Sequence, residues 1–175
     1  MTILNNVNVS ALEKVVTEAK TDKSKVKRTQ KIEGGWRLEE GGPQFQAKVT
    51  FEGGKMIMAS DQPTNLGGGG TLPGPLHYCF FGLLSCYTAT FAAMASMMGI
   101  RLNKLTAKLE GDLNFSRVFG LSKEPVMEQI GITLQVESDA PREKLEEVEK
   151  LAYERCPAVF ALTERVKLNT TLEVG

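Results

Sequence analysis

The sequence has few residues that could hold a metal ion or build a disulfide scaffold. It contains one histidine, His77, and three cysteines, with no Cys-x-x-Cys pair. A zinc site needs three or four good ligands close together, so we expect no metal site, and we expect no cofactor. The odd cysteine count, together with an N-terminus that lacks a signal-peptide pattern, leads us to expect a reducing, cytoplasmic location.

The sequence also lacks an excess of charge of either sign. Lys+Arg and Asp+Glu number 21 each. A protein without a net positive charge does not attract nucleic acid or anionic lipid over long range, so we expect neither a nucleic-acid partner nor a membrane partner. Residues 20–31 are locally basic, and a solvated helix face or linker is favoured there over a binding patch.

Residues 75–100 contain no Lys, Arg, Asp or Glu. This length would suffice for a transmembrane span. Polar residues are spread along the segment, however, and glycine and proline rather than basic residues precede it. The flanking amphipathic segments need a common apolar partner, which favours a buried core helix. Because this helix is apolar on all faces and one small sheet covers only one side, we expect a homodimer.

The remaining periodicity predicts an α+β fold in a single domain, residues 31–175, preceded by an N-terminal helical extension, residues 1–30. Residues 45–51 alternate apolar and polar side chains, as in a strand with one buried face. We expect helices at 10–29, 141–155 and 159–162, and strands at 32–38, 45–51, 56–59, 102–109, 130–136 and 166–174. Residues 111–125 are ambiguous.

The cysteine spacing alone leaves their role open. Cys79 and Cys86 lie seven residues apart on the predicted helix, about 10 Å along its axis. A disulfide needs Cα atoms within about 7 Å, so this pair cannot bridge without unwinding. Cys156, just before Pro157, can reach Cys86 only through tertiary structure. Free cysteines are often small buried hydrophobic residues, and the pattern by itself favours that interpretation.

Two motifs resemble those of a known family. In residues 74–86, Cys86 follows Pro75 by eleven residues along an apolar helix and is preceded by the small residue Ser85. Residues 154–157 place Cys156-Pro157 near the end of an amphipathic helix. Together, in this order, they resemble the OsmC/organic hydroperoxide resistance superfamily over about residues 31–174. The resemblance implies an antiparallel sheet wrapped around a long buried central helix, in an intertwined homodimer.

The resemblance also implies a chemistry. Cys86 would be the peroxidatic thiol and Cys156 the resolving thiol, reducing an organic hydroperoxide at the expense of a dithiol reductant. Family peroxidases place a glutamate just after the motif proline, where this sequence has Leu76 and His77. They also use an arginine, and Arg37 is the only residue of this sequence that could take its place. Without the carboxylate we expect a thiol pKa above the usual value and hence a weak peroxidase.

A second function remains open beside the reductase. A non-catalytic OsmC-like protein could bind a hydrophobic small molecule in an apolar cleft at the dimer interface. The Cys86 and Cys156 pair favours the enzyme, whereas the missing glutamate favours the binding protein. A membrane-inserted interaction protein is a third and less favoured interpretation.

Overall fold

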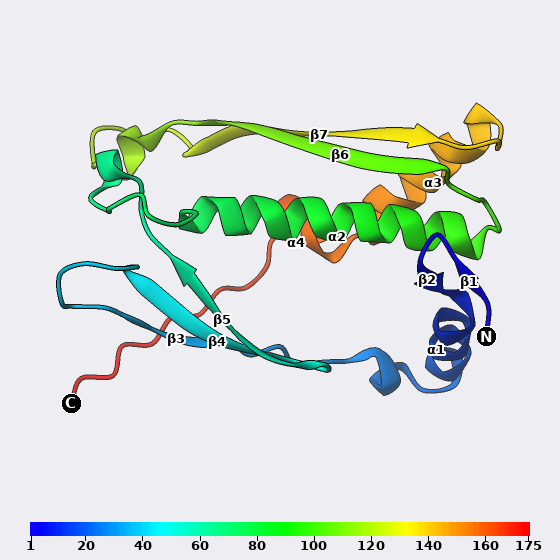
Figure 1. The fold of residues 1–175 in the computed structure, drawn as a ribbon, viewed down its shortest axis with the longest axis horizontal. Helices are drawn as coiled ribbons and strands as arrows, with labels where there is room; N and C mark the ends of the chain where they lie inside the picture. The colour runs from blue at the N-terminus through cyan, green and yellow to red at the C-terminus, as the bar shows by residue number, and fades with distance from the viewer. The chain divides into compact units, whose positions relative to one another are not determined.

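The computed structural model describes all residues from Met1 to Gly175. The chain forms two compact units: unit 1 contains residues 1–11 and 82–175, and unit 2 contains residues 12–81. Figure 1 traces the elements in order: β1 (Ile3–Leu4), β2 (Val7–Asn8), α1 (Val9–Thr21), β3 (Glu33–Trp36), β4 (Phe45–Phe51), β5 (Gly54–Ser60), α2 (Pro75–Met97), β6 (Lys104–Leu113), β7 (Met127–Glu137), α3 (Arg142–Arg155) and α4 (Pro157–Thr163). The predicted α+β class with antiparallel sheets is confirmed.

Unit 2 is built on an antiparallel meander in the order β3-β4-β5. The strand predicted at 45–51 is confirmed, but its expected buried face is not: Ala47 is buried, whereas Phe45 and Phe51 are exposed in this chain. β5 pairs with β4 along its full length, from Phe45 opposite Ser60 to Phe51 opposite Gly54. Beyond β5 lies a glycine-rich loop, held by the carboxylate of Asp61. This side chain is 1% exposed and accepts hydrogen bonds from the backbone N–H groups of Gly69 and Thr71 and from the Thr71 hydroxyl.

Helix α2 joins the two units. Pro75 occupies its first turn, where the missing N–H costs no hydrogen bond. Gly99, with a φ of 72°, ends it in a left-handed turn in which the Ile100 N–H donates to the Ala95 carbonyl. Its buried side chains are Leu83, Tyr87, Phe91, Ala95 and Ser96. The first four are spaced four residues apart and Ser96 adjoins the last, so they define one face, and this chain alone does not bury the helix on every side.

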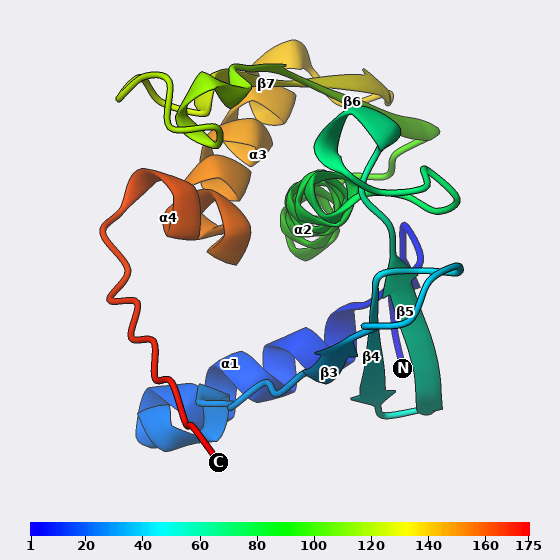
Figure 2. The same ribbon diagram turned by 90° about the vertical axis from the view of Figure 1, so that its left-hand side faces the viewer.

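Unit 1 packs that face against a hairpin and two helices. β6 and β7 form a long antiparallel pair that runs along α2 (Figure 1), and α3 and α4 pack on the same core (Figure 2). The fully buried side chains at its centre are Phe91, Ala95, Val148, Ala152 and Cys156. Burying a side chain the size of phenylalanine or valine contributes about 1.5–3 kcal/mol. This core therefore fixes α3, and with it Cys156, against α2.

The N-terminal hairpin of unit 1 holds the end of α2. Asn5 and Asn6 have positive φ values and form the turn between β1 and β2. The Asn5 side chain donates to the Ser96 hydroxyl (3.0 Å) and to the Ile100 carbonyl (2.8 Å), and accepts from the Leu102 N–H (2.8 Å). Residues 1–11 thus belong to the core unit. A domain boundary at residue 30 stays a prediction.

Several expected elements differ from those observed. The first helix ends at Thr21 rather than 29, because its apolar stripe stops there, and a short 3₁₀ turn follows at Lys23–Val26. The ambiguous residues after 110 extend β6 to Leu113. The single sheet expected is instead three separate sheets. The predicted strand at 166–174 is wrong for this chain: the segment is irregular and its alternate apolar residues are exposed, since no neighbouring strand pairs with it.

Candidate active site

The site is built where α2 passes the junction of α3 and α4. Cys86 lies near the middle of α2, beside the buried residues Leu83 and Tyr87. Cys156 ends α3 and begins α4, because Pro157 cannot donate the hydrogen bond that would continue α3. The Cys-Pro sequence therefore creates a break between two helices, and the core packing turns the Cys156 side chain toward α2.

The structure brings the two predicted thiols together. The Sγ atoms of Cys86 and Cys156 lie 3.6 Å apart, although the residues are 70 positions apart in sequence. Cys156 has no exposed surface, whereas Cys86 is partly exposed. Both are free thiols, and Cys79 is exposed on the first half of α2. A molecule from solvent therefore reaches Cys86 more readily than Cys156.

The surroundings of Cys86 act on its acidity in opposite directions. Burial raises the pKa of the Cys86 thiol above its ordinary value, and the neighbouring Cys156 raises it further, by its hydrogen bond and its charge. The backbone N–H of Ala158, in the first turn of α4, opposes this by hydrogen bonding to the Cys86 sulfur. The pKa of Cys86 is thus shifted in the expected direction, with burial as the largest cause.

The other predicted positions lie in unit 2. Arg37 directly follows β3; its backbone N–H donates to the Gln44 carbonyl (2.8 Å), and its Nε lies 4.0 Å from a Glu39 carboxylate oxygen. Leu76 and His77 stand in the first turn of α2, where the His77 Nδ1 accepts a hydrogen bond from the Gly74 N–H (3.2 Å). A catalytic role for Arg37 beside Cys86 stays a prediction.

A polar pair that the sequence pattern did not indicate joins the two helices that carry the thiols. The Tyr87 hydroxyl donates to Glu149 Oε1 at 2.9 Å. Burial raises the pKa of Tyr87, and the charges of Glu149 and Cys156 add to this, so the phenol remains a donor. Tyr87 follows Cys86 directly, and Glu149 precedes Cys156 by two helical turns. The seven-residue spacing on α3 was the signal that could have identified Glu149.

A cavity of about 480 Å³ opens beside this pair. Its walls are mainly apolar, and its lining residues are Leu83, Tyr87, Met127, Glu128, Gln129, Ile130, Ile132, Glu149, Tyr153, Val159, Leu162 and Thr163. Leu83 and Tyr87 flank Cys86 on α2, and Val159 follows Cys156 on α4. The cavity is therefore lined by residues from the helical turns that carry the two thiols, but neither Cys86 nor Cys156 lines it. No three His, Cys, Asp or Glu side chains are grouped so that they could hold a metal ion.

Comparison with known proteins identifies the fold. The family model described as OsmC-like protein matches residues 68–171, which include both thiols. An OsmC-like protein from Mycoplasma pneumoniae has 19% identity and a TM-score of 0.56, over 78% of this chain and 89% of its own. No curated protein matches the sequence.

Two further structures are similar. An organic hydroperoxide resistance protein OsmC from Legionella pneumophila has 19% identity and a TM-score of 0.54, over 78% of this chain and 92% of its own. An OsmC-like protein of unknown function from Vibrio cholerae has 16% identity and a TM-score of 0.54, over 78% of this chain and 95% of its own. At these identities the likeness concerns the fold.

Proposed function

The chain belongs to the OsmC-like protein family, and from this premise we propose that it reduces organic hydroperoxides with a dithiol reductant. Cys86 is the peroxidatic thiol and Cys156 the resolving thiol. The observation that carries the proposal is the 3.6 Å separation of their sulfur atoms across 70 positions of sequence. Core packing alone does not require two thiols to face each other, whereas a resolving reaction does.

The reaction balances with these two residues and a dithiol. The Cys86 thiolate attacks the terminal oxygen of the hydroperoxide, the O–O bond breaks, and the alkoxide leaves and is protonated to the alcohol. Cys86 is now a sulfenic acid. The Cys156 sulfur attacks it, forming the disulfide and releasing water. A dithiol then reduces the disulfide by two exchanges and leaves as its own disulfide.

The different burial of the two thiols supports their assigned roles. Cys86 is partly exposed and can meet a substrate, whereas Cys156 is fully buried and needs to meet only Cys86. The raised pKa of Cys86 means that little thiolate is present at neutral pH. We therefore expect slow peroxide consumption near pH 7.

A peroxide-consumption assay with cumene hydroperoxide and dithiothreitol tests the function. The wild type and Cys79→Ser, which alters an exposed thiol outside the pair, should consume peroxide at equal rates. Cys86→Ser should consume none above the background of the dithiol. Cys156→Ser should turn over only as fast as the dithiol itself attacks the sulfenic acid. Equal rates in Cys86→Ser and the wild type would refute the proposal.

A non-catalytic binding protein is the second candidate function. The apolar cavity and the raised pKa of Cys86 favour it, because both suit a site that holds an apolar molecule without reacting. Saturable binding of an apolar fluorophore, together with no peroxide consumption at any pH up to 9, would select this function over the reductase.

We also propose that the protein acts as a cytoplasmic homodimer. By length and composition alone, helix α2 could span a membrane. Only 28% of its most apolar 18 residues are buried within the chain. Phe81, 70% exposed, and the apolar residues of 166–174 are likewise uncovered. A second copy packed on α2 would bury this surface, as would a bilayer. Recovery of the protein in the membrane fraction would contradict the proposal that a second copy, rather than a bilayer, covers α2.

A further inference from the structure

Few directional contacts hold α2 against α3. The buried side chains between these helices are mainly apolar, and the attraction between apolar surfaces has no preferred direction. Three side-chain contacts cross from α2 to α3 or to its C-terminal cap, and they join Cys86 with Cys156, Tyr87 with Glu149, and Met94 with Arg155. The register of the two thiols therefore depends on the other two contacts.

The contact between Tyr87 and Glu149 is the stronger of these two. The Tyr87 hydroxyl donates to a carboxylate oxygen at 2.9 Å, and hydrogen bonds to carboxylates are among the strongest in proteins. Met94 offers only a thioether sulfur, a weak acceptor, and its contact with Arg155 is exposed and 3.5 Å long. The Tyr87 ring is only 4% exposed, so the core also holds its hydroxyl in place.

We propose that Tyr87 and Glu149 are positioning residues that set the register of α3 on α2 and so hold Cys156 within reach of Cys86. Tyr87 follows Cys86 directly, and Glu149 lies seven residues, or about two turns, before Cys156 on the same helix. A slide or rotation of α3 along α2 would move Cys156 away from Cys86, and the hydrogen bond opposes both movements. The inference rests on the proposed function and adds two residues to its resolving step.

A thiol–disulfide equilibrium with glutathione measures this positioning without any peroxide. Oxidised glutathione takes two electrons from the Cys86 and Cys156 thiols, which become a disulfide, and it leaves as two molecules of reduced glutathione. The equilibrium constant is the effective concentration of one thiol at the other, so it is larger when the pair is held in place. In a Cys79→Ser background, Tyr87→Phe should lower this constant roughly tenfold, because the ring stays and only the hydrogen bond to a carboxylate is lost.

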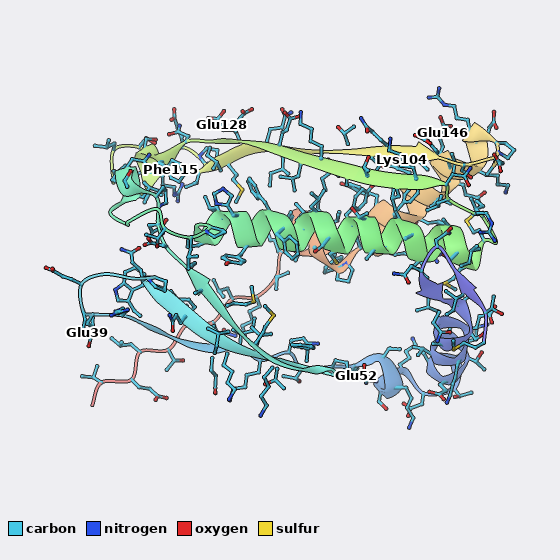
Figure 3. The ribbon with its side chains drawn as sticks, in the orientation of Figure 1. Glu39, Glu52, Lys104, Phe115, Glu128 and Glu146 are labelled. Atoms are coloured by element: carbon cyan, nitrogen blue, oxygen red, sulfur yellow. The ribbon has the colours of Figure 1, made fainter.

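Variants of Glu149 assign the effect to the hydrogen bond. Glu149→Leu should lower the constant as much as Tyr87→Phe, and the double variant should fall no further than either single variant, because both changes remove the same bond. Glu149→Gln keeps an acceptor oxygen and should stay within about twofold of the wild type. Glu146→Leu is the matched control: Glu146, labelled in Figure 3, pairs with Arg142 on α3 itself, so its loss should leave the constant unchanged.

Urea unfolding of the reduced variants separates positioning from stability. A hydrogen bond that only stabilises the fold would lower the unfolding midpoint of Tyr87→Phe and Glu149→Leu but leave their glutathione constants at the wild-type value, and this result would overturn the proposal. So would a constant that falls as far in Glu149→Gln or in Glu146→Leu as in Glu149→Leu.

The two measurements also separate this inference from the function. A wild type that consumes no peroxide, with glutathione constants that fall in the variants as expected, would refute the reductase and support the positioning. Peroxide consumption by the wild type, with constants that do not change in the variants, would support the reductase and refute the positioning. Where both hold, Tyr87→Phe should form the Cys86 sulfenic acid at the wild-type rate and convert it to the disulfide roughly tenfold more slowly.

Discussion

Oxidation should make the protein more stable toward heat. A Cys86–Cys156 disulfide would close a loop of 70 residues. In the chain-entropy model, a loop of that length reduces the entropy of the unfolded state enough to stabilise the fold by about 4 kcal/mol. For a protein of this size each kcal/mol raises Tm by about 2–4 °C, so we expect an increase of about 10 °C. Strain in bringing the sulfur atoms from 3.6 Å to bonding distance would reduce this figure.

Thermal unfolding followed by circular dichroism, before and after one equivalent of cumene hydroperoxide, measures the shift. The wild type and Cys79→Ser should both show it, and dithiothreitol should reverse it. Cys86→Ser and Cys156→Ser should show no increase, because neither can close the loop. An unchanged Tm in the oxidised wild type, or the same increase in Cys156→Ser, would refute the reasoning.

Three further predictions concern acidity, stability and assembly. Burial raises the pKa of Cys86, so the rate at which iodoacetamide labels it should rise about tenfold per pH unit from pH 7 to 8.5. The Cys79→Ser, Cys156→Ser variant, which keeps only Cys86, measures this rate, and a plateau below about pH 8 would contradict a raised pKa. Phe91 is 1% exposed, so Phe91→Ala should lower the free energy of unfolding in urea by about 3–5 kcal/mol, and a loss below about 1 kcal/mol would place Phe91 outside the core. Sedimentation velocity at micromolar concentration should show a dimer, and a stable folded monomer would sink that prediction.

Most of the fold could be predicted because its signals are local. The alternation at 45–51 and the charge-free stretch after Pro75 identified β4 and α2 with nearly correct bounds. The failures have a common physical cause. Residues 166–174 alternate like a strand, but a strand exists only where another strand supplies hydrogen bonds, and sequence periodicity does not reveal that partner. The helix after residue 9 ended early because propensity without an apolar face does not sustain a helix.

The site was predicted only in part. The two Cys motifs indicated the thiol pair, yet the cysteine spacing alone favoured three buried structural thiols. What the sequence could not supply was the partnership of Tyr87 and Glu149, which are 62 positions apart and lie on different helices. Nor could the sequence reveal the hydrogen bond from the Ala158 N–H to the Cys86 sulfur. Every residue but proline has a backbone N–H, and the fold alone decides which side chain it reaches. Such contacts depend on how α2 and α3 pack, not on the pattern of either helix.

The most direct test of the assigned roles is to trap the sulfenic acid. Cys79→Ser, Cys156→Ser, which keeps only Cys86, is treated with one equivalent of cumene hydroperoxide and dimedone, and the labelled peptide is identified by mass spectrometry. Cys86 should carry one dimedone per chain, while Cys156 in the matching Cys79→Ser, Cys86→Ser variant should remain unlabelled because it is fully buried. Labelling of Cys156 but not Cys86 would contradict the account.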